Sequence, residues 1–538
     1  MRPSGRGEFE SLYFTYPKFE PPSTSFVKEQ GYDFPVVIVG AGPIGMAAAL
    51  TLARHGIHSV LVDNKSTFND GSRAICVSRS SLYALERMGA AQPFIDKSLG
   101  WTTRRGYFEG REIGRFEMPH SADEKYLPMY NLQQQYIEQF LHAAVVASGM
   151  IDLRWQSEVI GCDSGPDQVA LKIHSPNGDY HLNAKYCLAA DGAHSPLRTM
   201  LGLRLKGTNL EGRYVIADVQ MEHDFPTERR AFFEPAANPG GTVLIHRQPD
   251  NIWRIDYQLA PNEDADEAIQ EANIRARVGA ILVDIGHDAP WDLEWWSIYS
   301  ANTLCLDEYR HDRVFFIGDS AHIVPIFGVR GLNNGLLDAE NIGWKLARVL
   351  NKTAPDALLE SYSLERRGAT LDVFENATKS AAFMTPPTAG YALMRKAALS
   401  LSLSQEFARG LANPRQMVPY DYQHSPLTSA DLPGFDTGPT PGSICPNLRL
   451  KNGYLLDEMG EGYTLLFFGD EDSAAALVAA GQTEDPGFKL LRFTQEDAQI
   501  TTAFDCQNGG AYLLRPDQHV AARWHILTPA TLAAAMSF

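Results

Sequence analysis

The feature that most constrains this chain is a glycine-rich turn between a predicted buried strand and a predicted helix. The apolar run 34–39 (FPVVIV) predicts a parallel strand, and the Ala- and Leu-rich run 46–54 predicts a helix. Between them lies Gly40-Ala41-Gly42-Pro43-Ile44-Gly45, and a second predicted strand, 58–62, ends at Asp63. This order of strand, glycines, helix, strand and acidic residue indicates a dinucleotide-binding βαβ unit.

Each part of this unit has a physical task in holding a dinucleotide. Gly40 allows the tight turn, Gly42 lets the backbone approach a pyrophosphate, and Gly45 lets helix and strand pack closely. The N-terminus of the helix offers unpaired N–H groups and partial positive charge to phosphates. Asp63 can accept hydrogen bonds from ribose hydroxyl groups, which a generic glycine-rich turn would not explain. The motif alone leaves NAD and FAD as alternatives.

Two later segments also end a strand-like run in a turn of glycine and aspartate. Residues 186–190 run into Asp191-Gly192, and residues 313–317 run into Gly318-Asp319. After the second turn come His322, which we expect to brace its own turn, then Pro325, a glycine-rich turn at 328–335, and a predicted helix from about 337 to 350.

With these three motifs in order, the sequence resembles the flavoprotein aromatic hydroxylases built like para-hydroxybenzoate hydroxylase, and most of all the hydroxyphenylpropionate and phenol hydroxylase types. Residues 40–45 resemble their ADP-binding turn. Asp191-Gly192 resembles the DG motif, which serves both FAD and the nicotinamide donor, and Gly318-Asp319 resembles the GD motif. The resemblance spans most of the chain from about residue 34 to 538. It departs from the family at Ile326, where many members have a second proline.

The resemblance implies which residues hold a non-covalently bound FAD. By matching residues of the family, the resemblance implies that Asp319 binds the ribityl chain, Arg73 contacts the flavin, and Gln134 binds the ribityl or phosphate region. The backbone N–H groups of Gly331-Leu332-Asn333 would meet the flavin pyrimidine, where a helix dipole stabilises negative charge. The full expected set, with no metal ligand, is Gly40, Gly42, Pro43, Ile44, Gly45, Asp63, Arg73, Gln134, Asp191, Gly318, Asp319, Gly331, Leu332 and Asn333.

Short alternating runs in the middle of the chain predict a sheet. Strands are expected at 214–221, 231–234, 242–247 and 253–259, with a hairpin turn at Asn251. Alternation puts Leu244 and His246 on one face. In the resembling family such a sheet covers the flavin and forms the substrate pocket, so the pocket candidates are His246, Tyr257, Pro325 and Ile326. A packed or solvent-facing position stays open for both His246 and Tyr257, and no catalytic residue is identified.

The predicted fold class is α/β: a Rossmann-type FAD-binding domain with an inserted antiparallel β-sheet substrate domain and a C-terminal thioredoxin-like domain. The Pro- and Gly-rich run 433–446 indicates a linker, and strands at 463–468 and 511–515 and a helix at 528–536 follow. Because the C-terminal unit lacks a CxxC pair, we expect it to stabilise or dimerise the protein rather than perform thiol chemistry. The expected divisions are an N-terminal arm (1–33), the FAD-binding domain (34–110, 130–210 and 297–400), the sheet domain (111–129 and 211–296), a linker region (401–446) and the thioredoxin-like domain (447–538).

Charge and cysteine content argue against several other classes. A formal net charge of -18 argues against broad nucleic-acid binding. No apolar run approaches the roughly 18 residues of a membrane span, and the first residues do not resemble a signal peptide. The 6 cysteines are scattered and favour free thiols in a reducing compartment. We therefore expect a cytoplasmic protein without nucleic-acid or membrane partners.

The resemblance implies a monooxygenase that uses FAD, NADH or NADPH, and O2 to hydroxylate a phenolic substrate through a flavin C4a-hydroperoxide. Such a site must exclude water and help to deprotonate the phenol, because a phenolate ring is the better nucleophile. Two alternatives stay open. An FAD-dependent dehydrogenase or oxidase of related fold would not be expected to carry both the DG and GD motifs, and a catalytically silent FAD- or ligand-binding regulator would not need Gly42, Asp191 and Asp319 intact.

Overall fold

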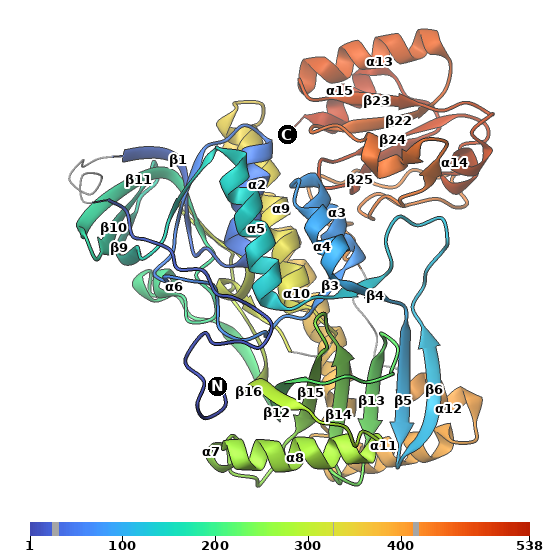
Figure 1. Cartoon of the computed structure of the whole chain (residues 1–538). Helices are drawn as coiled ribbons and strands as arrows, with labels where there is room; N and C mark the ends of the chain where they lie inside the picture. The colour runs from blue at the N-terminus through green and yellow to red at the C-terminus, as the bar shows by residue number, and fades with distance from the viewer. Residues whose placement is uncertain (24–31, 326–327, 413–418, 538) are drawn as a thin grey trace.

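The predicted βαβ unit forms the centre of the first sheet in the computed structural model, which describes residues 1–23, 32–325, 328–412 and 419–537 (Figure 1). Parallel neighbours build its middle, in the order β18 (Val314–Phe316), β11 (Gly178–Ala189), β1 (Tyr32–Val39), β2 (Ser59–Val62) and β8 (Ile151–Arg154). Antiparallel strands extend it, namely β17 (Arg310–His311), β9 (Glu158–Ser164) and β10 (Val169–Ser175). Each residue of β2 is buried, as expected for a central parallel strand.

Three helices lie beside this sheet, and the first of them packs against the other two (Figure 1). They are α2 (Pro43–Arg54), α5 (Gln134–Ser148) and α9 (Gly331–Leu350). We expected a turn at 328–335 and a helix from about 337, but α9 already begins at Gly331. The glycines serve close packing here, because a Cβ on Gly335 would lie 2.7 Å from Ile44. The remaining helices of this part are α3 (Arg79–Arg87), α4 (Ala91–Lys97), α6 (Pro196–Met200) and α10 (Glu360–Met384).

The second sheet forms the lower part of Figure 1. Its strands run in the order β19 (His322–Ile323), β16 (Asp292–Cys305), β12 (Lys206–Gln220), β15 (Ile252–Gln258), β14 (Thr242–Arg247), β13 (Arg229–Phe233), β5 (Thr103–Phe108) and β6 (Arg111–Glu117). Two expectations need correction. β13 and β5 are parallel, so the sheet is not purely antiparallel. The domain boundary that we expected at residue 110 separates β5 from β6, although these two strands pair with each other in this sheet.

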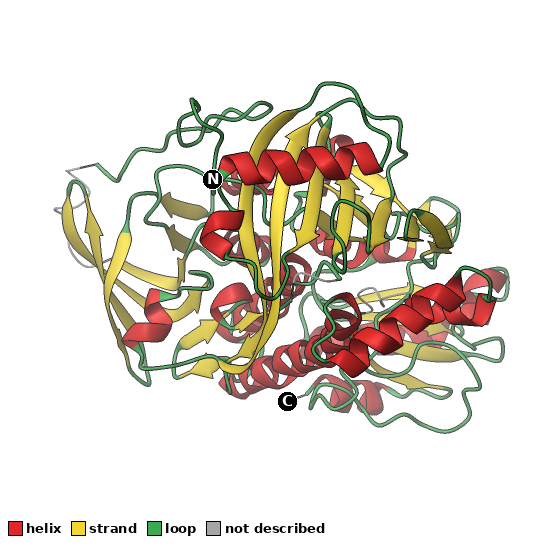
Figure 2. Cartoon of the chain, turned by 90° about the horizontal axis from the view of Figure 1, so that it is seen from below, coloured by secondary structure: helices red, strands yellow, loops and turns green. Residues whose placement is uncertain are grey.

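Helices cover one face of the second sheet. Figure 2 shows a long helix crossing the strands on the side away from the first sheet, where α7 (Ala265–Ala268) and α8 (Glu271–Asp284) lie. Apolar side chains of α8 and of the strands, such as Ile274, Val278, Val243 and Ile255, form one core there. The opposite face of the sheet therefore looks toward the first sheet and its helices.

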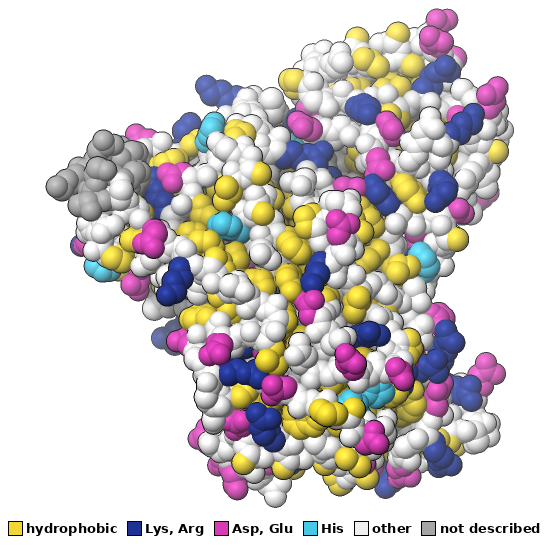
Figure 3. All heavy atoms as spheres, in the orientation of Figure 1, with side chains coloured by type: hydrophobic (Ala, Val, Ile, Leu, Met, Phe, Trp, Pro, Cys, Tyr) yellow, Lys and Arg dark blue, Asp and Glu magenta, His cyan; other side chains and the backbone are white. Residues whose placement is uncertain are grey.

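The C-terminal unit has its own sheet, in the order β23 (Lys489–Arg492), β22 (Thr464–Phe468), β24 (Gly510–Leu514) and β25 (Val520–Trp524). Its helices are α13 (Glu471–Glu484), α14 (Ala498–Ala503) and α15 (Pro529–Met536). Both predicted strands and the closing helix are confirmed to within two residues. Figure 3 shows charged side chains of both signs spread over the unit and the body below it.

Smaller elements link these three parts. They are the sheet of β3 (Cys76–Ser78), β7 (Met129–Asn131) and β4 (Leu99–Trp101), the pair β20 (Arg449–Leu450) and β21 (Gly453–Tyr454), the helices α11 (Ala389–Ser402) and α12 (Glu406–Arg409), and short 3₁₀ turns at Gly318–Ser320, Asp356–Leu359, Gly410–Ala412 and Leu455–Glu458. In the N-terminal arm, Arg2 pairs with Asp70 at 2.7 Å and with Glu294 of β16. The described part of the chain contains no helix long and apolar enough to cross a membrane.

Candidate functional site

The three glycine–aspartate turns of the sequence meet in the structure. Gly40 has φ +105°, and a Cβ on it would lie 2.4 Å from the carbonyl oxygen of Ala190, directly before the DG pair. Gly318 has φ +62°, and a Cβ on it would lie 3.1 Å from Ile44. These two positions require glycine, because both the backbone conformation and the close approach exclude a side chain. The turns at 40–45, 191–192 and 318–319 therefore form one continuous surface.

The turn that we expect to bind the pyrophosphate is open at the N-terminus of α2. Gly42 is the N-cap residue, no side chain caps the helix, and Pro43 stands in its first turn. A Cβ on Gly42 would meet nothing within 4 Å among the described atoms, so the backbone borders open space. Asp63 is buried and accepts hydrogen bonds from the N–H groups of Ala41 at 2.7 Å and Lys65 at 2.9 Å. Asp63 thus braces the glycine turn and retains lone pairs for a further donor.

Asp319 lies in the short 3₁₀ turn that follows β18. Its side chain is accessible from outside the protein. The surrounding protein atoms still partly desolvate the carboxyl group and raise its pKa, whereas His322 and Arg73 lower that pKa. His322 is fully buried, and its Nε2 lies 2.6 Å from Asp338 Oδ2, which also accepts from the N–H of Gly318 at 3.1 Å. His322 therefore braces the turn through α9 and leaves Asp319 accessible.

Gln134 supports the loop that carries Arg73. Its Oε1 accepts from the N–H of Ala74 at 3.2 Å, and its Nε2 donates to Glu138 at 2.8 Å. Arg254 of the second sheet donates to the carbonyl oxygens of Ser72 and, at 3.1 Å, of Arg73. The predicted arginine thus sits on a loop that is held from two sides, and its own side chain is exposed.

The first turn of α9 offers backbone groups rather than side chains. Asn333 is fully buried and its side chain is fully used. Its hydrogen-bond partners are the N–H of Ser78 (2.8 Å), the Oγ of Ser81 (2.7 Å) and the carbonyl oxygens of Cys76 (3.1 Å) and Val329 (2.6 Å). No side chain caps α9, so the N–H groups of Gly331, Leu332 and Asn333 lie at an uncapped N-terminus.

Asp191 has a carboxylate that the protein pairs only in part. Its Oδ2 accepts from the N–H of Leu197 at 3.1 Å, whereas its buried Oδ1 has no partner within the described ranges. Burial raises the pKa of this carboxyl group. A buried polar atom of this kind requires an explanation, and a bound polar ligand provides one.

Sequence reasoning missed most of a charged row on the inner face of the second sheet. Its strands place Arg229, His246, Arg254 and Asp218 side by side in register, and Asp256 follows Arg254 two residues along β15. We call these five side chains the polar face. Charged residues two apart in a predicted strand share a face, so the pair Arg254 and Asp256 was the available signal.

The members of the polar face differ in how they are paired. Arg254 Nε donates to Asp218 at 2.8 Å. Arg229 is 7% exposed. Its guanidinium group makes no hydrogen bond or ion pair with any residue that the structure describes. Among the same residues, His246 Nδ1 and Asp256 Oδ1 are buried without a partner. Burial lowers the pKa of His246 well below its usual value and raises the pKa of Asp256 to about 7.

The predicted pocket residues separate in the structure. His246 lies on the polar face, whereas Tyr257 packs in the core beneath α8, on the opposite face. Pro325 is buried where the chain leaves β19. Ile326 lies outside the described residues.

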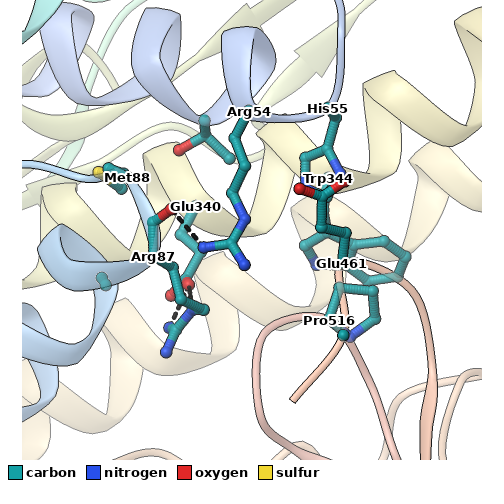
Figure 4. A pocket seen from close by; sticks show the side chains of 11 residues that line it. Arg54, His55, Arg87, Met88, Glu340, Trp344, Glu461 and Pro516 are labelled. Atoms are coloured by element: carbon teal, nitrogen blue, oxygen red, sulfur yellow. Dashed lines mark hydrogen bonds and ion pairs between the residues drawn. The ribbon is translucent and has the colours of Figure 1, made fainter. Parts of the chain in front are cut away.

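Two crevices lie elsewhere, between α9 and the C-terminal unit. Figure 4 shows one of them, with Arg54, Arg87 and Glu340 facing Glu461 and Pro516. The other contains Tyr420, Tyr422 and His519. Neither is lined by a predicted site residue, and Arg87 and Glu340 already form an ion pair.

Fold and site together define a dinucleotide-binding α/β protein with a second sheet beside its glycine turns. The chain belongs to the FAD binding domain family, which matches it over residues 33–377. The dinucleotide that the first motif left open is therefore FAD. The residues present fit it: two uncapped helix N-termini suit its negative charge, and Asp319 and Asp191 retain acceptors for its hydroxyl groups.

Known proteins resemble the whole chain. A 3-(3-hydroxy-phenyl)propionate/3-hydroxycinnamic acid hydroxylase of Mycobacterium sp. (strain JLS) is 25% identical over 520 residues, covering 91% of this chain and 89% of the relative. A para-nitrophenol 4-monooxygenase of Pseudomonas sp. (strain WBC-3) is 28% identical over 358 residues, covering 65% and 86%. Among solved structures, the flavin-dependent monooxygenase PieE in complex with FAD and substrate has a TM-score of 0.79 at 21% identity, covering 94% of this chain and 100% of that one. This last likeness shows the fold.

Proposed function

We propose that this protein is an FAD-dependent monooxygenase that uses NADH or NADPH and O2 to hydroxylate a phenolic ring. One observation carries the proposal: three FAD-type turns meet beside a sheet face that holds unpaired buried polar groups. The relatives named as hydroxylase and monooxygenase support it. An oxidase of related fold would not be expected to carry both the DG and the GD motif.

The chain's own residues would hold FAD from end to end. We assign its pyrophosphate to the α2 N-terminus at 42–45, its adenosine ribose to Asp63, and its ribityl chain to Asp319. Arg73 and the N–H groups of Gly331, Leu332 and Asn333 would meet the flavin ring, with Gln134 bracing the Arg73 loop. When bound, FAD supplies the redox chemistry that the amino acids lack.

The polar face would bind and orient the substrate. Arg104 of β5 lies in register with Arg229, and burial together with Arg229 lowers the pKa of Arg104 to about 10. Two neighbouring guanidinium groups repel each other, and an anion beside them reduces that repulsion. The relative from Mycobacterium is named for two phenols that carry a carboxylate. We therefore propose that the substrate is a carboxylated phenol held by Arg229.

The outer parts of the chain would support this site. We propose that the C-terminal unit is a thioredoxin-like domain, since α13 and α15 lie beside a mixed four-stranded sheet. Cys506 of this domain and Cys445 at the end of the linker region are buried free thiols far apart in the sequence, so the domain would stabilise or dimerise the protein. The FAD-binding domain would comprise the first sheet with its helices, and the substrate domain the second sheet, with β5 and β6 together.

Cofactor retention tests the assignment of Asp319. Asp319→Ala removes a charge-assisted hydrogen bond to FAD, so we expect FAD affinity to fall by about 10- to 100-fold, or about 1.5 to 3 kcal/mol. The variant should purify with little flavin absorbance. The control is Asp307→Ala, an exposed aspartate paired with Lys206, which should retain the flavin. A fully yellow Asp319→Ala protein would contradict the assignment.

Turnover tests the function itself. NAD(P)H oxidation by the wild-type protein should accelerate when carboxylated phenols are added, and mass spectrometry should show a product with one added oxygen. Oxidation of an unrelated substrate without a phenol effect would identify an oxidase or dehydrogenase instead.

A further inference from the structure

We propose that Asp256 is the catalytic base of this site: its carboxylate takes the proton of the substrate's phenolic O–H group. The inference rests on the proposed function and adds a residue to it. In the step, the phenol O–H bond breaks, an O–H bond forms on Asp256, and the electron pair stays on the phenolate oxygen. The negative charge moves from the carboxylate to the substrate, where it makes the ring more nucleophilic.

Asp256 is placed where a substrate could reach it. It lies in β15, in register with Leu244 of β14 and Ile216 of β12, on the inner face of the second sheet. The charges of Arg229 and Asp256 both shift the pKa of Cys76, so β3 lies near the polar face. Cys76 in turn accepts from Asn333 in the first turn of α9 at 3.1 Å. Cys76 thus connects the surroundings of Asp256 with the helix end that we assign to the flavin ring.

The protein leaves Asp256 free to exchange a proton. It is 4% exposed, its Oδ1 has no partner, and no ion pair joins it to Arg254 or Arg229 in the described part of the chain. Arg254 is instead committed to Asp218 and to the backbone of the Arg73 loop. Because buried carboxylates are almost always paired, an unpaired one beside a proposed ligand site indicates a function.

The charges around Asp256 suit a base that works near neutral pH. Burial raises its pKa to about 7; Arg254 lowers it, Asp218 raises it, and Arg229 lowers it. Burial also raises the pKa of Asp218, but its ion pair with Arg254 opposes that rise. Burial lowers the pKa of His246 well below its usual value and raises the pKa values of Cys76 and Tyr214. Asp256 is thus the carboxyl group of the polar face that combines a pKa of about 7 with the lack of an ion-pair partner among the described residues.

Kinetics of Asp256→Asn test the proposal. With a weakly acidic phenol at pH 7, we expect kcat to fall by about 100-fold or more, the usual effect of removing a general base. FAD content and substrate affinity should stay near wild-type values, because Asn has the same shape. The loss should shrink toward pH 10, where the phenol ionises in solution. It should also be much smaller for para-nitrophenol, a far more acidic phenol.

Two results would overturn this assignment. One is a rate within about threefold of wild type at pH 7, and the other is a loss that is the same at each pH and for both phenols, which would indicate a merely structural role. Asp224→Asn, an exposed aspartate outside the polar face, is the matched control and should behave as wild type. Should Asp256→Asn fold poorly, the wild-type pH profile of kcat/KM decides: a limb near pH 7 is expected, and its absence overturns the proposal.

Proton uptake gives a readout that needs no turnover. A bound nitrophenolate and an ionised Asp256 would repel each other, so at pH 8 wild-type protein should take up close to one proton when para-nitrophenol binds. Calorimetry in buffers of different ionisation enthalpy measures this uptake. Asp256→Asn should show none, and equal uptake by both proteins would overturn the assignment. Proton uptake without phenol-stimulated NAD(P)H oxidation would reject the proposed function while leaving the proton site intact.

Discussion

Two buried charged regions of this molecule are built in opposite ways. The first, which we call the paired cluster, joins α9 and α10 to the C-terminal unit and consists of Lys345, Glu365, Arg515 and Asp517. Glu365 lies 2.6 Å from both Lys345 and Arg515, and Arg515 lies 2.6 Å from Asp517. On the polar face, by contrast, Arg229 and Asp256 are buried without partners in the described chain.

The difference separates a structural use of charge from a functional one. A buried charge with an opposite partner is tolerated, and removing either partner is strongly destabilising. A buried charge without a partner costs stability in the folded protein and persists only where function requires it. Substitutions of a paired carboxylate in the cluster and of the unpaired Asp256 should therefore change stability in opposite directions.

The largest effect is expected in the paired cluster. Glu365→Gln leaves Lys345 without its carboxylate, and we expect the free energy of unfolding to fall by about 3 to 5 kcal/mol. Urea denaturation followed by circular dichroism measures the change. Since burial already lowers the pKa of Lys345 to about 8, the variant should be least stable at low pH, where the unpaired lysine must carry its charge.

A matched control lies on the same helix. Glu360 pairs with Arg310 at 2.9 Å, but its side chain is 71% exposed. Glu360→Gln should change stability by less than about 1 kcal/mol, as is usual for a surface ion pair. Similar losses for the two variants would contradict a special role for the paired cluster.

The sequence predicts the fold where local pattern decides it. The strand expected at 242–247 is β14 (Thr242–Arg247), and the unit at 34–63 forms as its glycines and Asp63 require. The parallel pairing of β13 with β5 could not be predicted, since it joins segments far apart in the chain. The early start of α9 was missed because its glycines pack against Ile44, a contact that only the folded chain reveals.

The same limit applies to the site. Glycine–aspartate motifs predict a cofactor cleft because their spacing reflects backbone geometry. Asp256 and Arg229 belong to no motif, and their importance comes from lacking partners, which sequence does not show. Alternation correctly places His246 on the opposite face of its strand from Val243 and Ile245. It cannot tell which of the two faces looks toward the glycine turns.

Asp256 should show the opposite sign of stability effect from Glu365. Its folded-state pKa of about 7 lies above the ordinary aspartate pKa of 3.8, so the folded state favours the protonated acid. That stability is present below pH 4 and is lost as the pH rises through 7. Asp256→Asn removes this loss. The free energy of unfolding of the variant, relative to that of the wild type, should therefore rise by about 3 kcal/mol between pH 5 and pH 8. Urea denaturation at the two pH values measures it.

A neighbouring aspartate sharpens this test. Asp218 lies on the same face but pairs with Arg254 at 2.8 Å. Asp218→Asn should destabilise the protein at both pH values, because Arg254 loses its only carboxylate partner among the described residues. If Asp256→Asn also destabilised it at pH 8, the contrast between paired and unpaired aspartates would fail.

The smallest effect is expected at Arg229 and concerns binding. Arg229→Gln should weaken the affinity for a carboxylated phenol by about 2 kcal/mol, roughly 30-fold. The affinity for the same phenol without its carboxylate should stay nearly unchanged. Calorimetric titration of both ligands measures the difference. Arg230→Gln is the control, since the next residue points to the other face, where it pairs with Glu228 at 2.5 Å and lies over Phe225. Equal losses for both ligands would instead place Arg229 beside the phenol oxygen, where it would stabilise the phenolate that Asp256 produces.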